Sequence, residues 1–230
     1  MQFMCFLKAR PERAGAFRQW FLEVHAPQLL ESALVPVQRL IVNLADCPPV
    51  GFAIYGGAEV AVGPQYDVIL QVWCESGADF EQLLADGEAE LQGWVEVMHS
   101  YRITETAVLH KPDLLVGKPT PGYKLVRGLF FHEDMPDSAV QRSWERHQHL
   151  AVNVHVGLAR YVRHWVDEAL SPDAPAIRGL SELHFPSEEA LLERYFDSAR
   201  GQEEILHDIG HFIGGGTHRF FAREHVLKPA

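Results

Sequence analysis

The chain has 230 residues, of which 47% are hydrophobic and 22% are charged, and its formal net charge is -11. This length and composition are typical of a globular protein with a sizeable core. The acidic balance argues against a nucleic-acid binder or a polybasic membrane-surface protein, because both need a basic face, and no apolar run approaches the roughly 18 residues of a membrane span.

The first half of the chain alternates apolar strand-like runs with helical stretches. In chain order we expect a strand at 3–9, a helix at 12–34, strands at 37–45 and 66–74, a helix at 78–99 and a strand at 101–112. The Gly- and Pro-rich loop at 46–65 is longer than an ordinary hairpin connection. It is interpreted either as a lid over an apolar pocket or as an arm at a subunit interface.

The second half repeats this order. Here we expect a strand at 123–133, a helix at 138–155, strands at 159–167 and 177–185, a helical stretch at 187–212 and a strand at 218–229. Landmarks recur in step, with "VWCES" against "LHFPS" and "AVLHKP" against "EHVLKP". The sequence therefore predicts two repeats, residues 1–112 and 122–230, joined by a Pro/Gly-containing linker at 113–121.

The element order predicts the fold class. Each half reads β-α-β-β-α-β, the ferredoxin-like order, with helices on one face of an antiparallel sheet. Strands such as 3–9 are apolar on both faces, so the bare face also needs a cover. We therefore expect an α+β protein whose two ferredoxin-like repeats pack sheet to sheet as an intramolecular dimeric α/β barrel. A chain of this kind is a pseudo-dimer, and further homodimer formation is left open.

Several short segments support a family resemblance. "HAPQL" at 25–29 follows the aromatic pair Trp20-Phe21, and the second half contains "GLARYV", "ELHFPSEEAL" and "HDIGHF". Together they resemble EthD-like proteins of the dimeric α/β-barrel superfamily. The resemblance implies a pocket between sheet and helices, with the helix-one His pointing into it. The superfamily hosts cofactor-free monooxygenases, isomerases, aldoxime dehydratases and haem peroxidases, so the fold does not fix the activity.

Two histidines are the candidate catalytic residues. His25 lies in the full motif and at the margin of the apolar helix face that includes Phe21, where an imidazole suits proton transfer. In the second half, aligning the Trp-to-His spacing with that of the first half favours His149, whereas the apolar face of the helix favours His147. Because two residues are about 200° apart on a helix, both cannot face the pocket. His149 is the preferred candidate, and the alternative stays open.

Aromatic and polar residues near the strands are candidate substrate contacts. The candidates are Trp20, Tyr66, Trp73, Tyr161 and His184. Glu182 shares a strand face with His184, so the two form either an acid/base group or a satisfied surface pair, and the surface pair is preferred. The pair His207 and His211 has chelating spacing but is interpreted as an exposed or capping pair near a helix end. No metal and no cofactor are expected.

The resulting functional hypothesis is a cofactor-independent lyase, isomerase or oxygenase acting on an apolar or aromatic small molecule. A pocket His would serve as general acid or base. The alternative is a non-catalytic ligand-binding or accessory protein of a degradation pathway, and a minor alternative is a haem-binding enzyme. Three cysteines without metal-type spacing favour reduced thiols in the cytoplasm. No nucleic-acid or membrane partner is expected.

Overall fold

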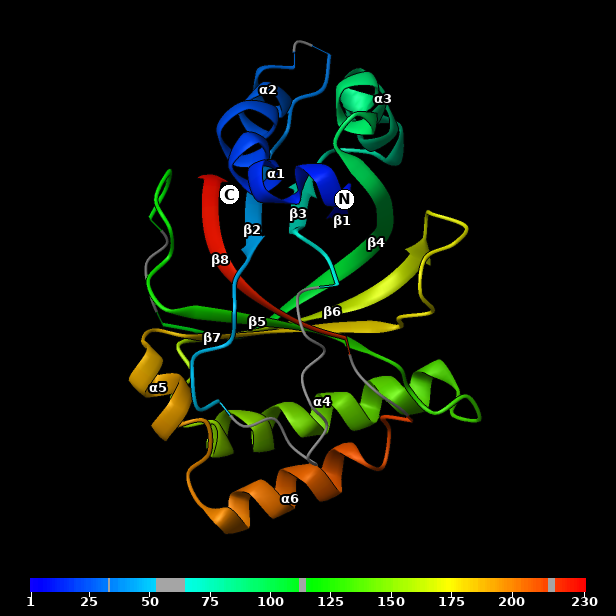
Figure 1. Ribbon diagram of the computed structural model, residues 1–230. Helices are drawn as coiled ribbons and strands as arrows, with labels where there is room; N and C mark the ends of the chain where they lie inside the picture. Colours follow the sequence, from blue (N-terminus) through cyan, green and yellow to red (C-terminus); the bar gives the residue numbers. More distant parts are fainter. Residues whose placement is uncertain (33, 53–64, 112–114, 215–217) are drawn as a thin grey trace.

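The computed structural model describes residues 1–32, 34–52, 65–111, 115–214 and 218–230. Its centre is a closed antiparallel barrel with the strand order β1-β3-β2-β8-β5-β7-β6-β4. The strands are β1 Gln2–Ala9, β2 Arg39–Ala45, β3 Val68–Trp73, β4 Val95–His110, β5 Tyr123–Leu129, β6 Arg160–Ala169, β7 Gly179–Phe185 and β8 His218–Lys228. The helices lie in two groups on opposite sides of this barrel (Figure 1).

The expected fold class, two ferredoxin-like repeats packed sheet to sheet, is wrong. The strands instead form one closed eight-stranded barrel, because β2 pairs with β8 and β4 pairs with β6 across the two halves. Two separate sheets would leave the N–H and C=O groups of these outer strands unpaired, whereas closure satisfies them. The division into 1–112, 113–121 and 122–230 stays a prediction. In the proposed linker, Val116 and Pro119 form bridges to β8.

The helices follow the apolar pattern of the sequence, with two differences in their ends. The first group contains a short 3-10 turn Pro11–Arg13, α1 Ala14–Trp20, a wide turn η2 Phe21–His25, α2 Ala26–Glu31 and α3 Gly77–Gln92. The second group contains α4 Asp137–Val154, α5 Glu188–Glu193 and α6 Ala199–Ile209. The expected helix at 78–99 stops early because β4 already begins at Val95. The expected stretch at 187–212 is two helices because Ser198 caps a new one.

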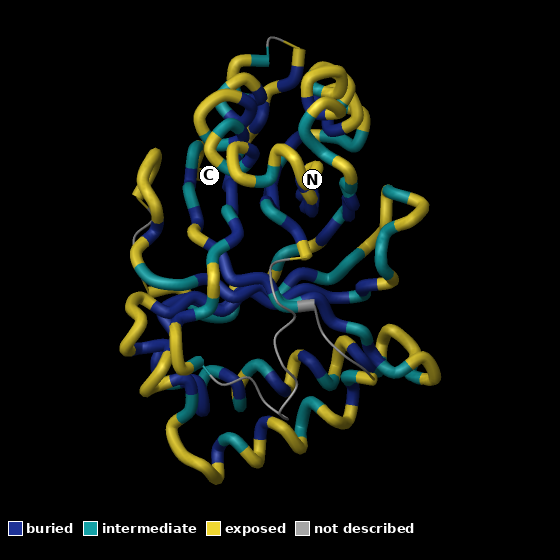
Figure 2. Tube along the Cα trace, viewed as in Figure 1, coloured by how far each residue is buried: buried dark blue, intermediate teal, exposed yellow. Residues whose placement is uncertain are grey.

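The strands at the centre of the molecule are mostly buried (Figure 2), and their residues alternate between two kinds of buried environment. One set points into the barrel, which we call the barrel interior; it includes Met4, Phe6, Ile69, Tyr101, Val126 and Phe220. The other set points outward under the helices. In the first helix–sheet layer it includes Phe3, Cys5, Leu7 and Leu70 with Phe17 and Phe21. In the second helix–sheet layer it includes Leu125, Tyr161, Leu183 and Phe221, with Trp144 and Phe212 beside them. Three separate buried compartments result, and each is a place where a site can form.

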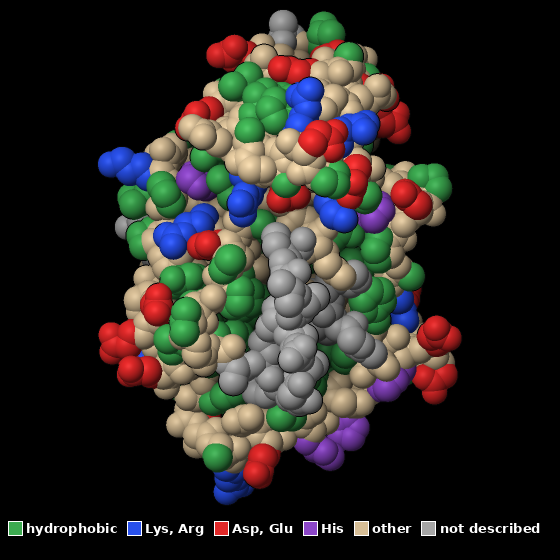
Figure 3. Space-filling view, viewed as in Figure 1, with side chains coloured by type: hydrophobic (Ala, Val, Ile, Leu, Met, Phe, Trp, Pro, Cys, Tyr) green, Lys and Arg blue, Asp and Glu red, His purple; other side chains and the backbone are tan. Residues whose placement is uncertain are grey.

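The surface differs from these compartments. Acidic, basic and apolar side chains are interspersed over the described part of the face shown in Figure 3. Among the helices that the structure describes, none combines the length and apolarity needed to cross a membrane.

Candidate functional site

His25 stands at the end of the wide turn that interrupts the first helix. Over Phe21–His25 the helix is of the π type, and the backbone N–H of Ala26 donates to the carbonyl of Phe21, five residues earlier. Pro27 explains the break, because it has no N–H and its ring would clash with the carbonyl four residues before it. π-Type turns inside helices occur frequently at functional sites. The "HAP" sequence thus builds the local geometry that aims His25 at the sheet.

The imidazole of His25 is buried in an apolar cavity. The residue is 4% exposed, and its ring lies 5.2 Å from the ring of Trp20 and 5.1 Å from that of Phe21. Its Nδ1 atom is buried without a hydrogen-bond partner. Burial lowers the pKa of His25 to about 4, so the ring is neutral at physiological pH. The unpartnered ring nitrogen can therefore accept a hydrogen bond from a ligand, and it is a weaker base than the imidazole of an exposed histidine.

The cavity around His25 adjoins an open groove of ligand size. The cavity itself measures about 10 Å³. Leu84, Leu91 and Met98 line both this cavity and a groove of about 400 Å³ between α3 and β4. Ligand sites commonly measure about 300–1,000 Å³ and are mostly apolar. These three side chains therefore form the wall between the groove and the cavity of His25.

A glycine of α3 makes room for the imidazole. A Cβ atom at Gly87 would lie 2.8 Å from Cε1 of His25 and 3.4 Å from its Nε2. Such a contact is too short, so a side chain at position 87 would push the ring away from its present position. The fit of His25 therefore depends on two elements far apart in the sequence, η2 and α3.

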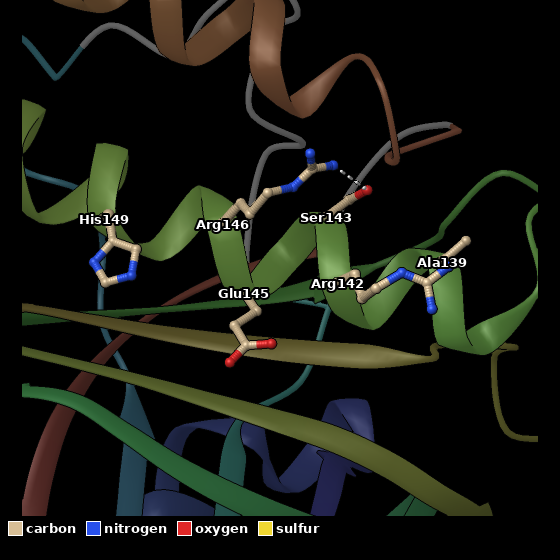
Figure 4. A pocket seen from close by; sticks show the side chains of 6 residues that line it. All are labelled: Ala139, Arg142, Ser143, Glu145, Arg146 and His149. Carbon is tan, nitrogen blue, oxygen red and sulfur yellow. Dashed lines mark hydrogen bonds between the residues drawn. The ribbon is translucent and has the colours of Figure 1, made fainter.

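In the second half, the preference for His149 as the inward residue is wrong. His149 is exposed, whereas His147 is 8% exposed and faces the sheet with Trp144 and Ala151. His149 borders a surface hollow of about 530 Å³ whose described lining residues all belong to α4 (Figure 4). The apolar face of α4 decides the orientation, because it buries the residues that share the helical phase of Trp144.

The second helix–sheet layer contains a paired histidine. His147 Nδ1 lies 2.7 Å from Asp208 Oδ2 of α6. Burial lowers the pKa of His147, although Asp208 acts in the opposite direction. Tyr161 is fully buried under α4, and burial raises its pKa to about 12, so it stays protonated. This layer places polar groups together that the sequence patterns did not connect.

The barrel interior holds a buried network of charges. Lys124 Nζ lies 2.7 Å from Glu182 Oε2 and 2.9 Å from Glu224 Oε2. Arg160 also pairs with Glu224, and His164 Nε2 lies 3.1 Å from Glu182 Oε1. The neighbouring cations hold the pKa of both carboxyl groups well below the usual range in spite of burial. The negative charges of two carboxylates are thus balanced by the positive charges of Lys124 and Arg160, which indicates a structural role for Glu182.

The five expected substrate contacts lie in all three compartments. Trp20 stacks on Trp94 at 4.5 Å and lies beside His25, so these two predicted residues are together. Tyr66 is in the barrel interior, where its hydroxyl is 2.8 Å from His99 Nδ1. Trp73 lies under the guanidinium of Arg39 at 4.2 Å. His184 Nε2 bonds to the carbonyl of Pro121 at 2.7 Å inside the barrel, and Tyr161 is under α4.

The candidate metal ligands lie at the surface, and the thiol of Cys5 is buried. His207 and His211 are exposed, with their Nε2 atoms 3.3 Å apart. Within the described ranges, no three His, Cys, Asp or Glu residues are grouped as metal ligands would be. Cys5 lines the His25 cavity, but burial raises the pKa of its thiol to about 12, so it is not a nucleophilic thiolate. The loop at 46–65 mostly lies outside the described residues; Phe52, at its described part, packs 5.3 Å from Phe221.

No family model and no curated protein matches the chain. Several solved structures, however, are similar to the chain in fold. The fold is similar to that of an anthrone oxidase-like protein, with a TM-score of 0.64, 11% identity, and coverage of 99% of this chain and 93% of the other. A protein from Fusobacterium nucleatum provisionally named a monooxygenase has a TM-score of 0.58 at 8% identity, with 99% and 92% covered. One from Lactobacillus acidophilus, also provisionally named a monooxygenase, has a TM-score of 0.53 at 7% identity, with 99% and 96% covered. These TM-scores and coverages show a shared fold over nearly the whole chain.

Proposed function

We propose that the protein is a cofactor-independent oxygenase that oxidises a small aromatic molecule bound beside His25. The observation that carries this proposal is the buried, unpartnered Nδ1 of His25 in an apolar cavity adjoining the α3–β4 groove. The names of the structurally similar proteins support an oxygenase. The narrower assignment to EthD-like proteins rests on the "HAPQL" motif, which contains the same His.

The chemistry needs a base and a dry site. A methylene group between two aromatic rings that are conjugated with a carbonyl group, as in an anthrone, loses a proton to His25 and forms a carbanion stabilised by the rings and the carbonyl. The carbanion then gives electrons to O2. In the net reaction the carbon exchanges two hydrogens for one oxygen atom, and the second oxygen atom leaves as water, so no external reductant is required. The apolar side chains around His25 keep water away from the carbanion.

The first test replaces His25 with Gln and measures oxygen consumption with anthrone as the probe. Turnover is expected to fall by about 10²–10⁴-fold, the usual contribution of a general base. His149→Gln is the matched control and is expected to retain full activity, because His149 is exposed on α4. Equal losses in both variants, or unchanged turnover in His25→Gln, would contradict the proposal. A Soret absorption band in the purified active protein would contradict the cofactor-independent part.

The pH dependence gives a second readout. Because the pKa of His25 is lowered to about 4, the base is unprotonated throughout the neutral range. The value of kcat/KM for the wild-type protein is therefore expected to be flat between about pH 8 and pH 5.5, instead of falling through the ordinary histidine pKa near 6.5. A profile of kcat/KM that rises or falls with a midpoint near pH 6.5 would show that another group is the base.

Replacing Gly87 with Ala tests the position of the ring without removing it. The new Cβ would contact His25 at 2.8 Å and displace the imidazole, so turnover is expected to fall by about 10²-fold. The helix preference for Ala over Gly stabilises by up to about 1 kcal/mol, whereas displacing a packed ring costs about 1–3 kcal/mol, so a net loss of at most about 2 kcal/mol is expected. Gly15→Ala in α1 is the control, since no atom lies within 4 Å of its added Cβ. Full activity in Gly87→Ala would place the reaction elsewhere.

A further inference from the structure

Two histidine side chains meet at the end of α6. His207 lies in the last turn of this helix, and His211 lies one turn later, after the helix has ended at Ile209. Their Nε2 atoms are 3.3 Å apart, and their rings are 4.7 Å apart and nearly perpendicular, at 82°. Both residues are exposed, so an ion from solvent can reach them.

The backbone that carries His211 is held in place by its neighbours. The N–H of His211 donates to the carbonyl of Asp208 at 3.1 Å, which continues the helical path beyond the end of α6. The next residue, Phe212, is 1% exposed and belongs to the same core cluster as Trp144. These two contacts keep His211 one turn from His207. The pair therefore needs little ordering before it binds a ligand, and pre-organisation of this kind favours binding.

The two imidazoles have only each other as polar partners. One Nε2 atom donates a proton and the other accepts it. Over the ranges that the structure describes, neither ring takes part in another hydrogen bond or in an ion pair. A shift of the donated proton from Nε2 to Nδ1 of the same ring would leave both Nε2 lone pairs free, with no proton released to solvent. A neutral imidazole with a free lone pair is the form that binds metal ions.

The distance between the two nitrogen atoms fits zinc. Zn–N bonds are about 2.0–2.1 Å long and zinc sites are tetrahedral, so two nitrogen atoms bound to one zinc ion lie about 3.3–3.4 Å apart. The octahedral geometry of Mg²⁺ would place two ligand atoms about 2.8–3.0 Å apart, and Mg²⁺ prefers oxygen. The observed separation of 3.3 Å agrees with the zinc value. Two histidines four residues apart on one helix face are also a recurrent pair of zinc ligands.

We propose that His207 and His211 chelate one Zn²⁺ ion through their Nε2 atoms, with water in the other two positions of the tetrahedron. In the described part of the chain, no third His, Cys, Asp or Glu residue joins them in a metal-binding group. The sequence of α6 contains two Glu and one Asp against one Arg, and the net charge of the chain is -11, so the local and overall charges both attract a cation. The site lies in the second group of helices, across the barrel from the group that contains His25 (Figure 1). It is therefore independent of the proposed oxidation.

The test titrates untagged protein with Zn²⁺ by calorimetry and measures the Tm at each zinc concentration. One ion is expected to bind per chain and to raise the Tm in a saturable manner, because the two histidines are held together only in the folded chain. Mg²⁺ at the same concentrations is expected to leave the Tm unchanged, because it prefers oxygen ligands. The absence of saturable zinc binding, or an equal effect of Mg²⁺, would overturn the proposal.

Substitutions identify the ligands. His207→Gln and His211→Gln are each expected to weaken zinc binding at least tenfold, since losing even a hydrogen-bond partner behind a ligand costs about 10–100-fold. Without zinc, both variants are expected to keep the wild-type Tm, because both side chains are exposed. His149→Gln is the matched control: His149 is also an exposed histidine, but no other histidine lies three or four residues from it, so zinc binding is expected to be unchanged. Undiminished zinc binding in the double variant His207→Gln/His211→Gln would place the ion on other residues.

Discussion

Replacing Lys124 with Met is expected to destabilise the protein by about 3–5 kcal/mol, the usual cost of breaking a buried ion pair. The side chain of Lys124 is 1% exposed and its ammonium group contacts Glu182, Glu224 and the side-chain oxygen of Gln71. Removing it leaves Glu182 facing a neutral partner in the closed barrel. Because whole domains are stable by about 5–15 kcal/mol, this change is large enough to unfold much of the population. Urea denaturation measures it.

Two comparisons make the result specific to charge. Lys8→Met is the control, because Lys8 pairs with Glu96 at the surface, and no measurable change is expected. The double variant Lys124→Met/Glu182→Gln removes one cation and one anion together and is expected to recover part of the lost stability. If the double variant is less stable than Lys124→Met, or if Lys124→Met is as stable as the wild type, then the network does not depend on charge balance.

Acid is expected to unfold the protein in a range set by its buried histidines. Burial lowers the pKa of His25, His155 and His184 to about 4, whereas the same residues titrate near 6.5 in an unfolded chain. Between these values the unfolded state binds more protons, so stability rises with pH and falls as pH is lowered below about 6.5. At pH 5 each histidine is expected to cost about 2 kcal/mol, or about 6 kcal/mol for the three together. The lowered pKa values of Glu182 and Glu224 also make stability fall as the pH is lowered. This loss begins only when the pH falls below the ordinary Glu pKa of about 4.3.

The measurement is the free energy of unfolding at half-unit steps from pH 7.5 to pH 4.5. His25→Gln is expected to reduce the slope near pH 5 by about one proton, or about 1.4 kcal/mol per pH unit, whatever its stability at neutral pH. The double variant His207→Gln/His211→Gln is expected to keep the wild-type slope, because both histidines are exposed. A slope that stays flat down to pH 5 in the wild-type protein would contradict the burial of neutral histidines.

Local features of the fold were predictable because they depend on neighbouring residues. The strands and helices follow from apolar periodicity, and the inward position of His25 follows from the phase set by Phe21. The ends of elements were less predictable. The beginning of β4 at Val95 depends on its pairing with β1, where Ala9 lies opposite Val95. Gly93, which ends α3, is the local signal for this boundary, and the expected helix at 78–99 ran past it.

The candidate sites were predictable in part. "HAPQL" identifies His25 by sequence alone, whereas Gly87 and Met98 reach the same cavity from α3 and β4 and carry no motif. The inward position of His147 could be predicted from the apolar face of α4. This is a stronger physical signal than the Trp-to-His spacing that favoured His149.

The sequence by itself determined the order of strands and helices, the place of His25 at the apolar helix face, and the acidic net charge. Tertiary structure decided the closure of the barrel, because the pairing of β2 with β8 and β4 with β6 joins residues fifty or more positions apart. It also decided which charges meet, since Lys124, Glu182 and Glu224 come from three strands whose register sets their contacts. Periodicity states which face a side chain occupies, but strand pairing alone decides what it faces there.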